Sequence, residues 1–594
     1  MFQSMVHIFL NSIEKNPEKD LFRYRDQETY RGISYREAGE IVEDLTCGMA
    51  AAGLKAGDKI AILSYNRPEW PLCDFAIFAL RGITVPIYHT LPAGQIAHIL
   101  KDSGARAIFV EDQVQWEKVR EIYQELNDLE MVFSFSTLNE NEIKYTEYRQ
   151  LLSEGKAFPT KQSHFFLRNV NEIDPQETCS LVYTSGTTGT PKGVMLNQRG
   201  FVINVVNSES VFGINADDVF LSFLPLSHLY ERLGGHWCPI YKGATIAYAR
   251  NISTVVEDIQ AVRPTVMVSV PRLYEKISSG VIDQVESGSG LRRKVFYAAL
   301  KAGRQYHEKK FAGKADKISE MKYRWADRLV FSKIKEKLGG RFRFPISGGA
   351  PLSVETLKFF EAIGLQIVEG YGMTETHLII TLTPPGNTKY GSCGKPIPEV
   401  EVKIAEDGEI LVSGNTLMQG YYNQPELTRE IIDEEGRLHT GDIGYLDEDN
   451  YLFITDRKKN ILVTAGGKNV APAPIEHAIR LSKYVEDVCL IGNKRRFISA
   501  LIIPNYEMLK QWAKEEGMDT ADTAGLLKQE RVRKLYEAEI EQLQADFAQY
   551  EKVKKFILLP QPLTVENGEL TPSLKIRRPV VEAHFKEEIE ALYQ

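Results

Sequence analysis

The sequence predicts an α/β protein. We expect a large N-terminal part of doubly wound sheets with a small β-barrel-like region, followed by an α+β C-terminal part. From Lys59 onward, KIAILSY, PEWPLCDFAIFALRG and ITVPIY have the patterns of a strand, a helix and a strand. Such alternation favours a mostly parallel sheet with helices on both faces. Short strands and turns dominate after about residue 400, and an α+β stretch follows from Arg457.

Each predicted element has a local reason. The first of these helices ends at Gly82, and the segment GQIAHILKDSG predicts another helix before the strand ARAIFVED. The helix SVETLKFFEAIG has Ser353 as its N-cap and Gly364 at its end. Further strands are predicted at DVFLSFLP, ATIAYA, PTVMVSVP and LQIVEGYG, and then at EVKIA, EDGEILVSG and GRLHTGDIGYLDEDNYLFI. The last part contains the helix PAPIEHAIRLS and a charged helix around 528–548.

Composition excludes several classes of protein. A chain of 594 residues is too long for one hydrophobic core. Its net charge of −8 argues against a dedicated nucleic-acid binder. The six cysteines form no C-x-x-C pair, which favours a reducing compartment and predicts no metal site built from cysteines. The first residues do not have the pattern of a signal peptide, and no apolar run is long enough to span a membrane, so we expect a cytoplasmic protein.

The stretch YTSGTTGTPKG, residues 183–193, has the composition of a polyphosphate-binding loop. Its three glycines allow close backbone approach, while its hydroxyl groups and Lys192 can donate to phosphate oxygens. It is not a Walker loop, because Gly193 stands where that motif requires Ser or Thr directly after the lysine.

Three further stretches add to this interpretation. YGMTE, residues 371–375, follows an apolar run and therefore places a hydroxyl and a carboxylate at the carboxyl end of a strand, where open α/β sheets bind ligands. HTGDIG carries Asp442 in a tight turn that can bind a ribose diol. TDRKKN, followed by GGKNVAP, combines cations with a glycine-rich turn.

Together these motifs resemble the adenylate-forming superfamily of acyl- and aryl-CoA ligases, firefly luciferase and peptide-synthetase adenylation domains. The resemblance covers roughly residues 30–590, and the motifs occur in the family's order. LTPSLKIRR is similar to the family's C-terminal lysine motif. Three features are most similar to the long-chain acyl-CoA synthetase branch: the stretch LPLSHLYER, residues 224–232, a basic insert at about 291–345, and the length of the chain.

The resemblance implies ATP-dependent activation of a long-chain fatty acid to acyl-AMP with release of pyrophosphate, then transfer of the acyl group to CoA. Two anions must meet in the first step, so cations and oriented donors are required. The β- and γ-phosphates would be held by Thr184, Ser185, Gly186, Thr187, Thr188 and Lys192. Thr374 would contact the α-phosphate and Glu375 would bind Mg²⁺. Adenine and ribose would meet Gly349, Tyr371, Gly372, Asp442 and Arg457, and CoA would pass Gly467.

Two further residues are implied to be catalytic. Lys575 would bridge the carboxylate and the α-phosphate, although Leu574 precedes it where the family usually has Gly. His228 would line the route between the acyl carboxylate and the thiol; a structural histidine is the alternative. We interpret Trp237 as a core residue rather than a gate of the acyl tunnel, and we consider a Glu231–Arg232 ion pair.

The family is built from a large N-terminal domain and a mobile lid. We therefore expect an N-terminal domain over residues 1–456 and a C-terminal lid over 457–594, with a hinge near 456–459 at Lys459. Because Lys575 and Gly467 would serve different steps, the lid should rotate between them. Alternatives to a long-chain CoA ligase are an acyl-AMP ligase that loads a carrier protein, a medium-chain or aryl CoA ligase, and a non-catalytic lipid-binding protein.

Residues 291–345 differ from the rest of the chain, with 17 Lys or Arg against 5 Asp or Glu. An apolar stripe at helical spacing runs through this basic segment and contains Trp325, Leu329, Val330, Ile334 and Leu338. One interpretation is a helical insert packed by that stripe, with solvated lysines. The other is a surface for peripheral contact with an anionic membrane. The sequence does not predict the oligomeric state.

Overall fold

The computed structural model describes residues 2–26, 29–158, 162–185, 191–251, 254–384, 386–564, 566–571 and 576–594. The chain forms two compact units, each described by itself. Unit 1 comprises Met1–Val402, Val412–Leu438 and Asp447–Leu452. Unit 2 comprises Lys403–Leu411, His439–Leu446 and Phe453–Gln594.

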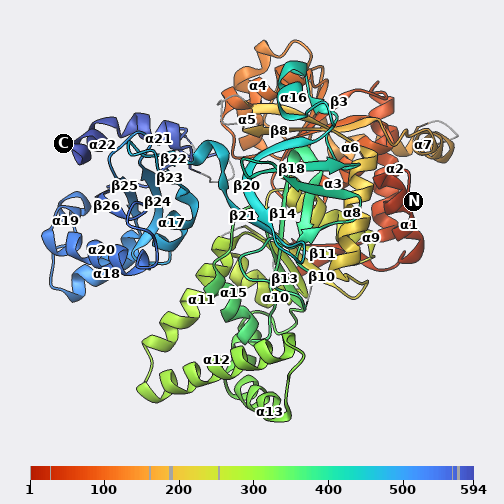
Figure 1. Ribbon diagram of the computed structural model, residues 1–594. Coiled ribbons are helices and arrows are strands. Elements are labelled where there is room, and N and C mark those ends of the chain that lie inside the picture. Colours follow the sequence, from red (N-terminus) through yellow and green to blue (C-terminus); the bar gives the residue numbers. More distant parts are fainter. Residues whose placement is uncertain are drawn as a thin grey trace. The chain divides into compact units, whose positions relative to one another are not determined.

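An eight-stranded sheet in unit 1 carries the predicted phosphate loop (Figure 1). Its order is β19-β9-β8-β4-β3-β5-β6-β7. The strands from β8 to β7 are parallel, and β9 and β19 extend the sheet in antiparallel fashion. The bounds are β3 Lys59–Leu63, β4 Ile83–Ile87, β5 Ala107–Val110, β6 Met131–Ser134, β7 Thr146–Glu147, β8 Thr178–Ser185, β9 Pro191–Asn197 and β19 Gly420–Tyr421.

A nine-stranded sheet in unit 1 has the order β16-β15-β14-β13-β12-β10-β11-β1-β2. Its six central strands, from β14 to β1, are parallel, whereas β2, β15 and β16 are antiparallel additions at the edges. The bounds are β1 Asp20–Asp26, β2 Thr29–Ser34, β10 Val219–Ser222, β11 Thr245–Tyr248, β12 Val266–Ser269, β13 Phe344–Ser347, β14 Val368–Met373, β15 Leu378–Leu382 and β16 Lys395–Pro396.

Helices cover these sheets as the alternation of apolar segments predicts. Leu63, Val85 and Val110 pack in one cluster with α4 (Ala93–Ser103) and α5 (Gln113–Ile122), on one face of the eight-stranded sheet. The other helices of unit 1 outside the basic segment are α1 Met5–Lys15, α2 Tyr35–Ala51, α3 Glu69–Ala79, α6 Tyr148–Lys156, α7 Gln162–Asn171, α8 Gln198–Phe212, α9 Cys238–Tyr241, α10 Val255–Val262, α11 Pro271–Glu286, α15 Val354–Ala362 and α16 Pro425–Ile431. The predicted doubly wound α/β fold is confirmed.

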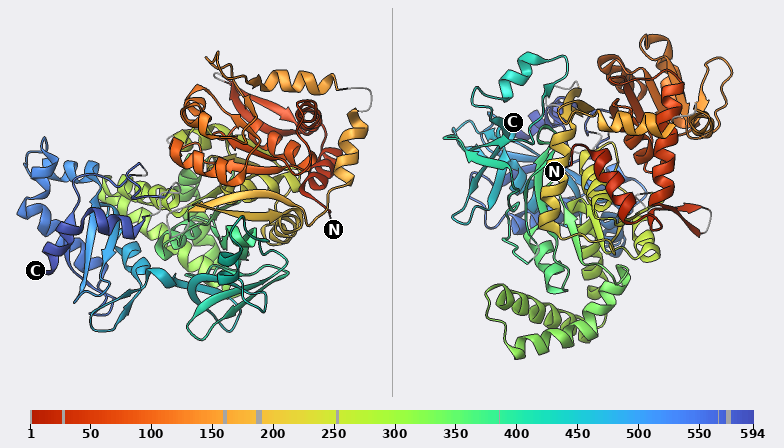
Figure 2. Two further views of the ribbon diagram at one scale, coloured as in Figure 1. Left: turned by 90° about the horizontal axis from the view of Figure 1, so that it is seen from above. Right: turned by 90° about the vertical axis from the view of Figure 1, so that its right-hand side faces the viewer.

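The basic segment is helical and projects from unit 1 (Figures 1 and 2). It contains α12 (Gly290–Phe311), α13 (Lys317–Ala326), a π-helical turn η4 (Asp327–Phe331) and α14 (Ser332–Lys337). Leu338 is buried, whereas Trp325 and Leu329 are exposed. The interpretation that the apolar stripe packs the insert is therefore wrong for these two residues.

Unit 2 contains the α+β part of the chain. In it, β22 pairs with β23, and β24, β25 and β26 form a three-stranded sheet. A four-stranded sheet has the order β17-β18-β20-β21, and each of its strands begins or ends in unit 1. The strand bounds are β17 Val400–Ile404, β18 Glu409–Gly414, β20 Leu438–Leu446, β21 Leu452–Arg457, β22 Leu462–Val463, β23 Asn469–Val470, β24 Val485–Ile491, β25 Ile498–Pro504 and β26 Val553–Leu558. The helices are α17 Pro472–Ile479, α18 Tyr506–Glu515, α19 Thr523–Leu527, α20 Glu530–Leu543, α21 Arg578–His584 and α22 Lys586–Tyr593. Within the described residues, none of the helices combines the length and the hydropathy needed to cross a bilayer.

A buried ion pair lies behind the phosphate-loop strands. Arg232, on the π-helix η2 (Tyr230–Trp237), donates from Nε to Asp74 Oδ2 at 2.8 Å and from Nη1 to Ser180 Oγ at 2.9 Å. Thr84 Oγ1 donates to Asp74 Oδ1 at 2.8 Å. The guanidinium also lies 4.8 Å from the ring centroid of Trp237, which is fully buried. The interpretation of Trp237 as a core residue is confirmed, and this network joins α3, β4, β8 and η2.

The considered pairing of Arg232 with Glu231 is wrong. Successive helical residues project in different directions, so the two side chains separate. Glu231 is fully buried, and its Oε1 lies 3.8 Å from His236 Nδ1. Burial raises the pKa of Glu231 to about 8, so the carboxyl is largely protonated at neutral pH.

We predict that Arg232→Met lowers the free energy of unfolding by about 3–5 kcal/mol, because it leaves Asp74 charged and buried without its cation. The matched control is Arg429→Met, which breaks the Arg429–Glu426 pair, whose side chains are 71% and 80% exposed. This control should lower the free energy of unfolding by less than about 1 kcal/mol. Denaturant unfolding measures both; similar losses in the two variants would contradict the importance of the buried pair.

Candidate active site

The predicted phosphate loop joins two antiparallel strands, β8 and β9. Thr184 lies opposite Lys192 in the ladder, so a hydroxyl and an ammonium stand on facing strands where the loop begins and ends. The backbone of Ser185 is the last described part of β8. Gly186, Thr187 and Thr188 lie outside the described residues.

Tyr183 anchors this hairpin to the neighbouring helix. Its hydroxyl donates to Asp102 Oδ2, near the end of α4, at 2.6 Å. Burial and this carboxylate raise the pKa of Tyr183, so its proton stays on the oxygen. Gly193 lies close against the same ring: a Cβ at position 193 would stand only 3.1 Å from Tyr183 Cζ. The tyrosine therefore holds the hairpin in place.

One aromatic side chain connects the loop lysine with the predicted metal-binding carboxylate. Lys192 Nζ lies 5.2 Å from the ring centroid of Tyr421, and the Tyr421 hydroxyl donates to Glu375 Oε1 at 2.8 Å. Tyr421 belongs to β19, which pairs with β9 opposite Val194. Burial and the Glu375 carboxylate raise the pKa of Tyr421, so it remains a hydrogen-bond donor. The structure thus brings Lys192 and Glu375 to one place.

The segment 371–375 turns at the carboxyl end of β14, as predicted. Tyr371 and Gly372 are strand residues, and Thr374 and Glu375 begin a short 3₁₀ turn, η5 (Thr374–Thr376). A β-bulge lies between Tyr371 and Gly372. A Cβ at Gly372 would stand 1.5 Å from the carbonyl oxygen of Leu378, so the close antiparallel partner requires glycine there.

His377 fixes this turn against β9 and was not singled out in the sequence. Its Nε2 accepts a hydrogen bond from the Asn197 backbone N–H at 3.0 Å, and its Nδ1 donates to the Thr416 carbonyl at 2.8 Å. Burial lowers the pKa of His377 to about 4, so the ring is neutral. Gly200 leaves room for this ring, because a Cβ would lie 2.4 Å from it. The histidine ties the Glu375 turn to the start of α8.

His228 and Gly349 occupy loops that follow strands of the nine-stranded sheet. His228 Nδ1 accepts from the Tyr230 backbone N–H at 3.1 Å, so the proton of the neutral ring is on Nε2. Its ring stands edge-on to Tyr88, with centroids 6.5 Å apart. Gly349 has φ 80°, a left-handed conformation that favours glycine.

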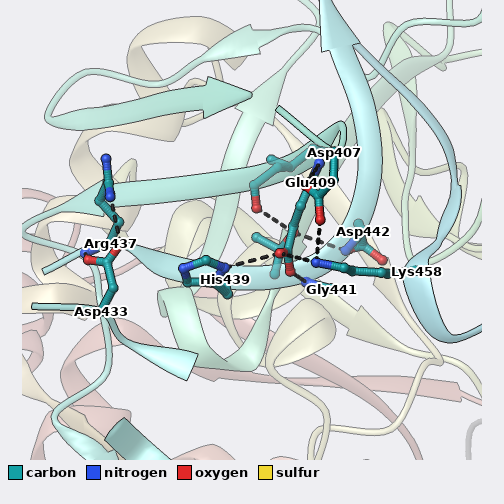
Figure 3. Close-up of polar contacts among 10 residues, drawn as sticks. Asp407, Glu409, Asp433, Arg437, His439, Gly441, Asp442 and Lys458 are labelled. Carbon is teal, nitrogen blue, oxygen red and sulfur yellow. Dashed lines mark hydrogen bonds and ion pairs between the residues drawn. The ribbon is translucent and has the colours of Figure 1, made fainter. Parts of the chain in front are cut away.

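A second cluster lies in unit 2 around Asp442 (Figure 3). Arg457 Nε donates to Asp442 Oδ1 at 3.0 Å, and the Asp442 N–H donates to Thr440 Oγ1 at 3.1 Å. Asp442 is buried, while the Arg457 side chain is 55% exposed. The two residues that the sequence assigned to ribose are therefore in direct contact.

Glu409 organises this cluster, and it too was not singled out in the sequence. Its carboxylate accepts from the Gly441 N–H at 3.0 Å, from His439 Nδ1 at 3.0 Å and from Lys458 Nζ at 2.9 Å. Figure 3 shows Glu409 between these donors. Burial opposes ionisation of Glu409, but the hydrogen bonds from His439, Lys458 and Gly441 outweigh it and lower its pKa. The glutamate fixes both the turn before Asp442 and the residue after Arg457.

The remaining predicted residues of unit 2 are spread along the chain. Lys459 lies in a 3₁₀ turn, η6 (Lys458–Asn460), and Gly467 lies in the β22–β23 turn with φ 72°. Lys575 lies outside the described residues. Neighbouring Arg578, whose side chain is 15% exposed, pairs with Glu476 at 2.7 Å, so it holds the C-terminal segment on α17.

The donor set near Glu375 suits Mg²⁺ that is held mainly by a substrate. Mg²⁺ keeps several waters and is usually bound by one or two carboxylates together with phosphate oxygens. Throughout the described part of the chain, no group of three or more His, Cys, Asp or Glu residues is arranged to hold a metal by itself. The buried Glu375 carboxylate beside the predicted phosphate-binding hairpin fits this pattern.

Comparisons with known proteins agree with this arrangement. The AMP-binding enzyme family matches residues 9–422, and the AMP-binding enzyme C-terminal domain matches 459–594. The chain is 34% identical to long chain acyl-CoA synthetase 6, peroxisomal, of Arabidopsis thaliana, covering 95% of this chain and 82% of that protein. It is 32% identical to the long-chain-fatty-acid–CoA ligase FadD15 of Mycobacterium tuberculosis, covering 97% and 95%.

Solved structures show the same fold. The anthranilate CoA ligase AuaEII in complex with anthranoyl-AMP has a TM-score of 0.74 at 20% identity, covering 99% of this chain and 98% of that one. The adenylation domain of a carboxylate reductase from Mycobacterium chelonae has a TM-score of 0.77 at 23% identity, covering 99% and 91%.

We predict that Glu409→Gln lowers the free energy of unfolding by about 1–3 kcal/mol at pH 7, because an ionised acceptor for three donors is lost. The pKa of Glu409 is lowered in the folded state, so its stabilisation is present above the ordinary value of 4.5 and disappears as the pH falls through the lowered value. The deficit of the variant should therefore shrink below about pH 4.

The matched control is Glu537→Gln, which removes an exposed carboxylate paired with Arg533 at 3.0 Å on α20. Denaturant unfolding between pH 3 and 7 measures both variants. A deficit for Glu409→Gln that stays constant over this range would contradict the proposed role of the charge.

Proposed function

Because the chain belongs to the AMP-binding enzyme family, we propose that it is an ATP-dependent long-chain fatty acid:CoA ligase. The observation that carries this function is the identity of 32–34% with long-chain acyl-CoA synthetases over at least 95% of the chain. The contacts of Lys192 and Glu375 with Tyr421 support it, since a cation and a carboxylate meet one ring beside the predicted phosphate-binding hairpin.

The reaction has two steps. A carboxylate oxygen of the fatty acid attacks the α-phosphorus of ATP, and pyrophosphate leaves, which gives acyl-AMP. The sulfur of CoA then attacks the acyl carbon, the bond to the AMP oxygen breaks, and the thiol proton is lost. Acyl-CoA and AMP are the products. The first step brings anions together, so oriented donors and cations supply most of the required stabilisation.

The chain's own residues divide this work. The β- and γ-phosphates are held by Thr184, Ser185, Gly186, Thr187, Thr188 and Lys192. The α-phosphate is held by Thr374. Glu375, oriented by Tyr421, binds Mg²⁺ together with the phosphates. When bound, Mg²⁺ offsets phosphate charge and orients the pyrophosphate leaving group. Tyr371, Gly372 and Gly349 border the adenine, and Asp442 accepts hydrogen bonds from the ribose hydroxyls beside Arg457.

The later part of the chain serves the two steps in turn. We place the boundary between residues 1–456 and 457–594, with the hinge at Lys459. Two observations support this boundary. The match to the C-terminal domain family begins at residue 459, and the longest segment of unit 2 begins at Phe453. Lys575 bridges carboxylate and α-phosphate during adenylation, whereas Gly467 borders the route of CoA and His228 the route to the acyl carbon.

The alternatives are an acyl-AMP ligase that loads a carrier protein, and a medium-chain or aryl CoA ligase. The decisive experiment is ATP–pyrophosphate exchange with acids of different chain length, followed by AMP release with and without CoA. A long-chain CoA ligase exchanges pyrophosphate best with long-chain acids and releases AMP rapidly only with CoA. Exchange without CoA-stimulated AMP release would point to a carrier protein, and preference for short or aryl acids would overturn the proposed substrate.

We also propose that this cytoplasmic enzyme visits the anionic face of a membrane through the basic segment 291–345. Long-chain acids partition into bilayers, so the enzyme finds its substrate there. The excess of 17 Lys or Arg over 5 Asp or Glu supports the contact, since each basic residue near an anionic leaflet contributes about 1 kcal/mol. The attraction weakens with salt, because charges farther apart than about 8 Å are screened at physiological ionic strength.

We predict that Lys575→Ala slows acyl-AMP formation by about 100-fold or more, but changes thioester formation from supplied acyl-AMP by less than about tenfold. Only the first step needs this cation against the phosphate. The control is Lys586→Ala, an exposed lysine at the start of α22, which should leave both steps unchanged. Rapid-quench measurement of each half-reaction separates the outcomes, and an equal loss in both would remove Lys575 from its assigned role.

We predict that Glu375→Gln loses adenylation about 100-fold and that added Mg²⁺ recovers only part of it, because the carboxylate charge is gone. Tyr421→Phe keeps the ring beside Lys192 but removes the hydroxyl that orients Glu375. The loss of adenylation in Tyr421→Phe should be smaller, about tenfold, and added Mg²⁺ should recover more of it. Titration of adenylation with Mg²⁺ measures both; an unchanged Mg²⁺ dependence in Glu375→Gln would place the metal elsewhere.

A further inference from the structure

An apolar face is exposed on the outer helix of the basic segment. Ile318, Met321, Trp325 and Leu329 are 63%, 54%, 59% and 55% exposed. Their spacing of three and four residues puts them on one side of α13 and η4, and we call them the outer face. Among the described residues, eight of the fifteen exposed large hydrophobic side chains lie between Leu291 and Leu329. Contiguous exposed apolar patches are uncommon on monomeric soluble proteins, so these four side chains on one helix face indicate a binding surface.

The outer face is exposed because the opposite side of α13 is already packed. Tyr323 stacks on Tyr306 of α12, with ring centroids 4.7 Å apart and planes 13° from parallel. It also meets His307 edge-on at 5.1 Å. These contacts fix which side of α13 faces outward.

The helix α12 is in turn fixed to the body of unit 1. Gly303 allows α12 to approach α15 closely, because a Cβ there would lie 2.2 Å from the Ala362 carbonyl oxygen. Phe296 and Leu300, on the same side of α12, are buried. Figures 1 and 2 show α12 and α13 extending away from the sheets of unit 1. The outer face is therefore presented on a rigid support.

Cations border the outer face. Lys317, Lys322, Arg328 and Lys333 are exposed, and no ion pair joins any of them to an acidic side chain in the described part of the chain. The acids of α13 and η4 already have partners within the segment, since Glu320 pairs with Arg324 and Asp327 with Lys335. The rim of the outer face is thus positively charged.

We propose that α13 and η4 form an interfacial helix that lies in the plane of an anionic bilayer. The outer face enters the boundary between headgroups and acyl chains, and the flanking cations meet lipid phosphates. An amphipathic helix with apolar side chains on one face and Lys or Arg beside them has this mode of binding. Tryptophan favours the membrane–water interface, because its ring is apolar and its N–H is polar.

This inference rests on the proposed membrane contact and deepens it, because charge alone does not require burial of apolar side chains. A second copy of the chain would cover the apolar face but would bring the same cations against each other. An anionic lipid surface satisfies both the apolar face and its positive rim. Binding should therefore keep an apolar contribution that high salt does not remove.

Trp325 provides a direct test in the unaltered protein. Of the other tryptophans, Trp70, Trp116 and Trp237 are fully buried, and Trp512 is partly buried. Vesicles of phosphatidylcholine and phosphatidylserine carrying brominated acyl chains should quench and blue-shift the Trp325 emission, and Trp325→Phe should abolish the change. Vesicle binding without quenching of Trp325 would overturn the inference.

Substitution gives a second test with a matched control. A triple variant of the outer face should cosediment with these vesicles at least about tenfold less, because three apolar side chains no longer enter the lipid. This variant is Ile318→Ser/Met321→Ser/Leu329→Ser. Val114→Ser/Leu167→Ser/Val256→Ser, which changes three exposed apolar residues elsewhere in unit 1, should bind like the wild type. Equal binding by both triple variants would contradict the proposed insertion.

Two further experiments distinguish lipid insertion from charge attraction and from dimerisation. Reversal of Arg292, Arg293, Lys294, Lys309 and Lys310 to Glu should weaken binding at low salt, whereas the outer-face variant should lose the part that remains at high salt. A wild-type dimer that the outer-face variant dissociates, without vesicle binding, would overturn the inference in favour of a second copy. Adenylation of a water-soluble medium-chain acid reports on the ligase function alone, so failure of that assay is distinguishable from failure of lipid binding.

Discussion

The contact of Tyr421 with both Lys192 and Glu375 is the interaction on which the site in unit 1 depends. The ring stands beside the ammonium and the hydroxyl donates to the carboxylate, so one rigid side chain sets the positions of two opposite charges. Triphosphate needs the cation, and Mg²⁺ needs the anion. The aromatic side chain therefore holds both beside the predicted phosphate loop, where the nucleotide and its metal are proposed to bind.

The surrounding structure keeps these groups in place by close backbone approach and neutral buried side chains. Gly372 lets β14 bulge against β15, and the neutral His377 joins the following turn to β9. The buried Asp74–Arg232 pair connects η2 with α3, and its hydrogen bonds extend to β4 and to β8, the strand before the phosphate loop. In unit 2, Glu409 plays a comparable part for Asp442. In both units a residue that need not touch the nucleotide fixes the residues that are proposed to do so.

Local patterns in the sequence predicted much of the fold, and long-range contacts account for most of what they missed. Alternating apolar segments with glycine at helix ends predicted β3, α3, β4, α4 and β5, because these features are set within a few residues. Tyr421 and Glu409 escaped notice because their partners come from distant parts of the chain. The Glu231–Arg232 pair was wrong because neighbours in a helix diverge. Periodicity located the stripe through Trp325 and Leu329, but periodicity alone does not tell a buried face from an exposed one.

Transfer of an isotope tests the central claim most directly. Fatty acid labelled with ¹⁸O in both carboxylate oxygens should be incubated with the enzyme, ATP, Mg²⁺ and CoA, and the released AMP analysed by mass spectrometry. If the carboxylate attacks the α-phosphorus, one labelled oxygen remains on AMP after the thiol attacks the acyl carbon. The account predicts one ¹⁸O per AMP and none in pyrophosphate. Unlabelled AMP, or label in inorganic phosphate with formation of ADP, would contradict it.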